Sequence, residues 1–242
     1  MYEALVAMEA PPTLIAWASA EERDQHDAKA LLALNQDPAW SIWIYAAEGI
    51  PLRALVDAAL LEADEAVERL TEMQAPLRQA LRLARAILAG TTDSELVLAA
   101  AERAEALIDE TEGSYRSLST QPVVTPTASA CAYLARAAEA LFSAELSLST
   151  QRLVNAQYNA ALLGAGTSAL VHGNTHALCL NPAALARDPV QSMALFVPAA
   201  VAEAVAQLLV AHDKHMTGES PRDLAAAMNA RMGALLSPFV HA

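Results

Sequence analysis

The chain has 242 residues, a formal net charge of −13 and a pI of about 4.8. An acidic excess of this size repels nucleic acid and anionic membrane surfaces, so we expect neither as a partner. Hydrophobic residues make up 55% of the chain and aromatic residues only 5%. Alanine supplies much of the hydrophobic fraction, which favours many closely packed helices over one thick core.

Helix start and stop signals follow one another along the chain. Ser19 followed by Glu22 predicts a capping box, and Asp37 before Pro38 predicts an N-cap and a first helical turn. The expected helices cover residues 19–34, 37–49, 51–73, 76–90, 92–110, 128–148, 150–163, a short stretch after 182, 198–214 and 221–236. Alternating and β-branched runs are lacking, so we predict an all-α array or bundle of about eight to ten antiparallel helices with no sheet.

The helix expected over 51–73 has the clearest two-sided pattern. Its apolar residues recur at intervals of three and four, which places them on one face. Four acidic residues are expected on the other, solvated face: Asp57, Glu62, Glu65 and Glu68.

One segment differs in composition from the helices around it. Residues 113–127 contain two prolines and many serines and threonines, which predicts a linker or an ordered loop. We expect this segment to divide an N-terminal helical array, 1–112, from a C-terminal array, 128–242. The alternative is one continuous domain in which the segment only exchanges packing partners.

The most apolar stretch covers residues 193–211. It is interrupted by Pro198, Glu203 and Gln207, and the three together favour a buried core helix over a membrane span. Pro198 is expected to begin that helix.

The two cysteines indicate a reducing compartment. Cys131 and Cys179 each lie among apolar residues and lack metal-ligand spacing, so we expect two buried reduced thiols. Residues 1–10 carry two glutamates and no basic residue, so they do not resemble a signal peptide. A cytoplasmic location is expected.

Four histidines in the second half of the chain are candidate metal ligands: His172, His176, His212 and His215. Spacings of four and three residues place each pair on one face of a helix, an arrangement that binds Zn²⁺ or iron. The competing interpretation is that His212 and His215 interact with the free carbonyl groups at a helix C-terminus. No glutamate is followed three residues later by histidine, so the di-iron motif of helical bundles is lacking.

The motifs of nucleotide binding and nucleophilic catalysis are not found. Gly164-Ala165-Gly166 follows an expected helix rather than a strand, and there is neither a P-loop nor a Gly-x-Ser-x-Gly elbow. We therefore predict no catalytic residue and no cofactor.

The densest aromatic group is Trp40, Trp43 and Tyr45, within the helix expected over 37–49. Trp and Tyr are enriched among residues that dominate protein interfaces, so this group is the candidate partner-binding site. The competing interpretation is that these side chains anchor the N-terminal helices to the core.

Residues 75–106 resemble a known family. The run Pro76-Leu-Arg-Gln-Ala-Leu-Arg-Leu-Ala-Arg-Ala-Ile-Leu-Ala-Gly90 precedes an alanine-rich helix, and Arg85 and Gly90 occupy matching places. This part of the chain is similar to the small α-helical immunity proteins of bacterial polymorphic toxin systems. The resemblance covers about a third of the chain and implies a protein that neutralises a toxin by binding it; no functional residue is carried over.

Together these observations favour a non-enzymatic protein that binds a basic protein partner through an acidic surface, as an immunity-type protein does. One alternative is a helical bundle that binds a metal or small ligand, or an enzyme, through the late histidines. A second alternative is a structural or scaffold protein that forms homo-oligomers through its alanine-rich faces.

Overall fold

A computed structural model describes residues 1–20, 23, 26–113, 121–150, 189–215 and 220–239. Within these ranges the chain forms ten α-helices and one short 3₁₀ helix, and no strand, which confirms the all-α prediction. The helices expected at 150–163 and after 182 lie outside the described residues.

Helix bounds follow the chain order. They are α1 (Tyr2–Ala7), α2 (Pro12–Ser19), α3 (Ala28–Leu34), α4 (Pro38–Ala47), α5 (Leu52–Glu68), α6 (Gln74–Leu88), α7 (Ser94–Gly113), α8 (Gln121–Thr150), α11 (Pro189–His215), α12 (Pro221–Leu236) and η2 (Ser237–Phe239).

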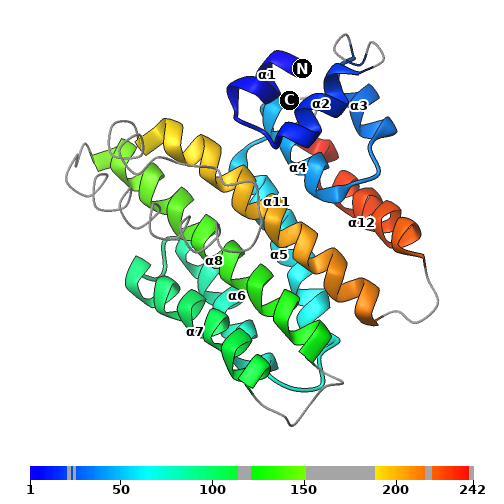
Figure 1. Cartoon of the computed structure of the whole chain (residues 1–242). Helices are drawn as coiled ribbons and strands as arrows, with labels where there is room; N and C mark the ends of the chain where they lie inside the picture. The colour runs from blue at the N-terminus through cyan, green and yellow to red at the C-terminus, as the bar shows by residue number, and fades with distance from the viewer. Residues whose placement is uncertain (21–22, 24–25, 114–120, 151–188, 216–219, 240–242) are drawn as a thin grey trace.

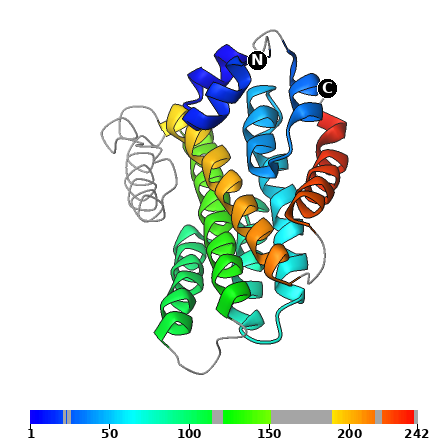
Figure 2. The ribbon, with the colours of Figure 1, turned by 45° about the vertical axis from the view of Figure 1, so that its right-hand side comes forward.

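The two longest helices, α8 and α11, form the centre of the molecule. They run antiparallel and pack against each other, and α5 contacts both (Figure 1). α6 and α7 cover α8 on one side, while α4 and α12 lie on the side of α5 and α11 (Figure 2). The short helices α1, α2 and α3 gather at one end, beside α4. α7 is therefore an edge helix, and its outward side faces away from the bundle.

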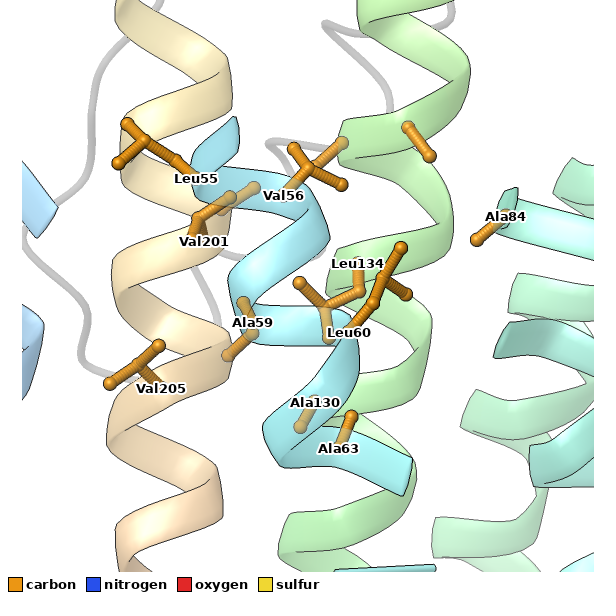
Figure 3. Packing of buried hydrophobic residues seen from close by; sticks show 14 of the residues in the cluster. Leu55, Val56, Ala59, Leu60, Ala63, Ala84, Ala130, Leu134, Val201 and Val205 are labelled. Carbon is orange, nitrogen blue, oxygen red and sulfur yellow. The ribbon is translucent and has the colours of Figure 1, made fainter. Parts of the chain in front are cut away.

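Small side chains allow the central helices to approach one another. Eight alanines of α8 between 128 and 144 are buried, on several faces of the helix. Interaxial distances between packed helices depend on the side chains at the contact, so alanine permits close packing. The branched side chains that fill the remaining space come from α5, α8 and α11, as Figure 3 shows for Leu55, Val56, Leu60, Leu134, Val201 and Val205.

Several predicted helix ends are confirmed by their hydrogen bonds. Asp37 is the N-cap of α4, where its side chain accepts a hydrogen bond from the Ala39 N–H. Ser220 caps α12 in the same way through the N–H of Asp223. After α6 the chain turns at Gly90, whose φ of 69° lies in the left-handed region that glycine adopts without strain.

Ser19 does not begin a helix, so the predicted capping box is wrong. It is the last residue of α2, and its hydroxyl donates to the carbonyl of Ala16 one turn earlier. The next helix begins at Ala28, with Asp27 as the N-cap. A serine side chain satisfies backbone groups at either end of a helix, so the Ser-x-x-Glu pattern alone did not decide which end this was.

Two helices begin seven or more residues before the positions that we predicted for them. α8 begins at Gln121, so residues 121–127 of the predicted linker are helical, and Pro126 lies inside the helix. α11 begins at Pro189 and contains Pro198 in its interior. Both prolines lie among buried apolar residues, and the packing of those neighbours outweighs the lost backbone hydrogen bond.

One hydrophobic core joins the two predicted arrays. Buried residues of α5 and α6 from the first array form a single cluster with buried residues of α8, α11 and α12 from the second. Within the described residues, the core is therefore not divided at 113–127.

One segment in the described part of the chain, Leu195–Lys214 of α11, is long and apolar enough to cross a membrane by length and composition. A buried core helix meets the same length and composition criteria. In this segment, 67% of the apolar window is buried inside the protein.

Candidate functional site

Two of the three predicted partner-binding aromatics lie in the core. Trp43 is 2% exposed and Tyr45 is 7% exposed, and both belong to the main hydrophobic cluster. Burial raises the pKa of the Tyr45 phenol. These two side chains anchor α4 and offer no surface to a partner, so the structure favours the anchoring interpretation for them.

Trp40 remains partly exposed and pairs with a tryptophan from another helix. Its ring centroid lies 5.6 Å from that of Trp17 in α2, with the two planes tilted by 51°. The guanidinium of Arg23 lies 5.0 Å from the Trp17 ring centroid and also donates to the Trp17 carbonyl at 3.1 Å. The cationic group on this aromatic pair is thus supplied by the chain itself.

Only one of the four candidate histidines has a described side chain. His172 and His176 lie outside the described residues, and of His215 the structure describes only its place at the end of α11. His212, one turn earlier, is 4% exposed. In the described part of the chain, no group of three or more His, Cys, Asp or Glu side chains is arranged to hold a metal ion.

The surroundings of His212 oppose a bound cation. Its Nδ1 lies 2.6 Å from a guanidinium nitrogen of Arg69, which can only donate, so Nδ1 accepts and Nε2 carries the proton. That Nε2 is buried and has no hydrogen-bond partner among the described residues. Burial and the positive charge of Arg69 lower the pKa of the imidazole. A neutral ring held by an arginine is a structural element of the α5–α11 contact.

Arg69 belongs to a network of charges that connects α5, α11 and α12. It forms an ion pair with Glu65 one turn earlier on α5. Glu65 lies 3.9 Å from the Nε of Arg231 on α12. Arg231 in turn donates two hydrogen bonds to Glu62, from Nε at 2.8 Å and from a terminal nitrogen at 2.6 Å.

Glu62 is the buried member of this network, and our sequence-based assignment of it to the solvated face was wrong. It is only 3% exposed, whereas the side chain of Arg231 is 42% exposed. The periodicity of the sequence already indicated that Glu62 is buried. Glu62 is separated from Leu55, Ala59 and Ala66 by helical intervals, so it lies on the same buried stripe as they do. Its partner, 169 residues away, was not visible in any local pattern.

The outward side of α7 is acidic. Glu95, Glu102 and Asp109 recur every seven residues and are exposed, with the small exposed residues Ala99 and Ala106 between them. A seven-residue interval is two helical turns, about 10 Å, so the three carboxylates form a row along the helix.

Two arginines of α7 and α8 lie on or beside this helix. Arg103 is the only basic residue in α7, and Arg136 of α8 is paired with Glu105 at the flank of the helix. We call Glu95, Glu102 and Asp109 the α7 acidic row.

Two buried groups, Cys131 and Glu139, lie on α8 between the packed helices. Cys131 is buried and unpaired, as predicted, and burial raises the pKa of its thiol, so it is unreactive. Glu139 is 1% exposed and accepts a hydrogen bond from Ser143 at 2.6 Å. Burial raises the pKa of Glu139 as well. Cys179 lies outside the described residues.

Compared with protein-family models, curated proteins and solved structures, the chain matches none.

Proposed function

We propose that this chain is a non-enzymatic binding protein that engages a basic protein partner through its acidic exterior, as an immunity-type protein engages a toxin. The α7 acidic row carries the proposal. It lies on an edge helix, points away from the bundle, and presents three carboxylates of one sign along about 20 Å.

The physical basis is electrostatic complementarity. A row of like charges on a chain with a net charge of −13 attracts a basic surface over distances of about one Debye length, near 8–10 Å at physiological salt. The alanines between the carboxylates let long lysine or arginine side chains reach the helix without steric hindrance. The resemblance to immunity proteins at 75–106 falls on α6 and the first part of α7, the same hairpin.

The test compares two charge-reversal variants with equal net charge. The first carries E95K, E102K and D109K on α7, and the control carries E3K, E48K and E72K, which are exposed at other sites. Each set changes three charges by two units, so both raise the net charge by six. Each protein is immobilised and exposed to a lysate of the cell that encodes the chain, and retained proteins are quantified after washes at low and high salt.

We expect the wild-type chain to retain a basic protein at low salt and release it at high salt. The α7 variant should retain that protein at least tenfold less, while the control retains it within about twofold of the wild type. If the two variants lose the protein equally, net charge alone is responsible and the α7 acidic row is not the binding site. If no basic protein is retained by the wild type, the proposal is wrong.

A further inference from the structure

α7 is held on the bundle from one side. It packs mainly on α8 and α6, and its opposite side, which carries the α7 acidic row, is exposed (Figure 1). A helix with neighbours on one side only can open locally, at a lower free energy than the central helices need. Two polar contacts join α7 to α8, one in each half of α7.

The two polar contacts differ in chemistry. In the second half of α7, Glu105 forms an ion pair with Arg136 of α8. At the start of α7, the side chain of Ser94, the first residue of the helix, is hydrogen-bonded to the carboxyl group of Glu139 on α8. The hydroxyl of Ser143, one turn further along α8, donates to the same carboxyl at 2.6 Å. The contact at the start of α7 therefore consists of a carboxyl and two hydroxyls.

Glu139 is buried without a counter-ion. It and Glu62 are the two buried acidic residues in the described part of the chain, at 1% and 3% exposed. Glu62 is paired with Arg231. No basic side chain among the described residues forms an ion pair with Glu139, because Arg136, one turn earlier on α8, is engaged by Glu105. A buried carboxylate without a cation is strongly unfavourable.

The two hydroxyls suit a carboxyl that carries a proton. A protonated carboxyl both donates and accepts, so Glu139 can accept from Ser143 and donate to Ser94. The ionised carboxyl only accepts, and it must hold a full charge away from water. Within the described residues, the groups that stabilise this charge are the same two hydroxyls, and no charged group of α5, α6, α7 or α11 contributes. Burial therefore favours the protonated form.

We infer that Glu139 is a pH-sensitive switch for the attachment of α7: the helix is held on α8 while the carboxyl carries a proton, and it opens more readily once the carboxyl is ionised. Any opening that brings Glu139 into water lets it ionise as an exposed glutamate does, so a rise in pH favours that opening. Separation of α7 is the smallest such opening, because α7 is an edge helix whereas α5 and α11 form the centre of the molecule with α8. How α7 is held does not depend on whether the α7 acidic row binds a partner.

The first measurement is the titration of the Glu139 carboxyl in the full chain, by ¹³C NMR of side-chain-labelled glutamate, with E139Q to assign the signal. We expect a midpoint above the value of about 4.3 for an exposed glutamate. S94A should raise the midpoint further, because it removes a hydrogen bond that stabilises the carboxylate. S19A removes an exposed hydroxyl elsewhere and should leave the midpoint unchanged. A wild-type midpoint at or below about 4.3 would overturn the inference.

Hydrogen exchange measures the attachment of α7 in the unmodified chain. Protection factors, which correct for the effect of pH on intrinsic exchange rates, are compared at about pH 5 and about pH 8. At the higher pH, amides of α7 should be at least tenfold less protected than those of α5, because α7 opens without global unfolding. Between the two pH values, the protection of α7 should fall about tenfold for each unit by which the measured midpoint exceeds that of an exposed glutamate.

Two variants assign the response to Glu139. E139Q keeps the shape of the protonated acid and cannot ionise, so the protection of its α7 should be independent of pH and equal to that of the wild type at about pH 5. E203Q removes another carboxyl whose pKa is raised by burial, on α11, and is the matched control; its α7 should respond as the wild type does. An equal fall of α7 protection in the wild type and E139Q would refute the switch. If E139Q does not fold, the wild type still decides: α7 protection that is constant with pH, or equal to that of α5 at both pH values, would refute it as well.

Discussion

Replacing Arg231 by methionine tests whether the buried charge on Glu62 depends on α12. The substitution removes both hydrogen bonds to a carboxylate that is 3% exposed, and leaves it without its partner. Removing one member of a buried ion pair costs about 3 kcal/mol. For a protein of this size, such a change lowers Tm by about 6–12 °C.

Replacing the other member of the pair, Glu62, should cost less stability. In Glu62→Met the remaining group is Arg231, whose side chain is 42% exposed and can turn toward water. We expect a cost of about 1 kcal/mol. The double variant has no unpaired charge and has two apolar side chains of similar size, so its stability should lie within about 1 kcal/mol of the wild type.

The assay is urea unfolding followed by circular dichroism at 222 nm, on the wild type, both single variants and the double variant. Arg222→Met serves as the control, because Arg222 is exposed on the same helix; it should change stability by less than about 0.5 kcal/mol. A cost for R231M no larger than that for E62M, or a double variant that loses the sum of the two single costs, would show that the Glu62 charge does not depend on Arg231.

Other predictions concern pH, packing and a helix end. The folded-state pKa of His212 is lowered, so the unfolded chain binds its proton more readily; the contribution of His212 is fully present above pH 6.5 and is lost as the pH falls below it. H212N, whose side-chain oxygen accepts from Arg69 without titrating, should flatten the pH dependence of the urea midpoint between pH 6.5 and 5.5; a slope equal to that of the wild type would contradict this. Leu134→Ala should cost about 2–5 kcal/mol by leaving a cavity between α5 and α8, measured by the same unfolding curves; a cost under 1 kcal/mol would show that the site collapses. Gly90→Ala should cost about 1 kcal/mol from its positive φ alone, because nothing lies within 4 Å of the added Cβ; an unchanged midpoint would refute the strain.

Two buried carboxyls, Glu139 and Glu203, change the stability of the fold in the opposite direction to His212 as the pH falls further. Burial raises the pKa of Glu139 and Glu203, so the folded chain binds those protons more readily than the unfolded chain. Their burial reduces stability above their ordinary pKa, and this penalty disappears as the pH falls toward it. The His212 effect is therefore cleanest in the interval directly below pH 6.5.

Much of the fold was predictable because the deciding signals are local. Alanine favours helix in isolation, and side-chain caps such as those of Asp37 and Ser220 act within four residues of their own positions. Prolines were less informative, because Pro126 and Pro198 lie inside long helices whose neighbours are buried. Tertiary packing keeps the chain helical at those two prolines, and rules based on local sequence do not take tertiary packing into account.

The candidate sites depended far less on local sequence. Trp43 and Tyr45 have the composition of an interface, but their burial was decided by helices that pack on α4 from distant parts of the chain. The contacts of Arg231 with Glu62 and of Asn229 with Ser41 join residues 169 and 188 positions apart, so no spacing rule indicated them. A carboxylate in register with a buried stripe, such as Glu62, is the one local sign that a remote arginine is needed.

The uneven placement of the indole rings has a practical result for spectroscopy. All three tryptophans of the chain, Trp17, Trp40 and Trp43, lie in α2 and α4 at one end of the molecule. Intrinsic emission from this protein therefore monitors that end, and a partner that bound to α7, or a loosening of α7 from α8, would leave it almost unchanged. Optical titrations at the α7 end need a reporter dye attached there.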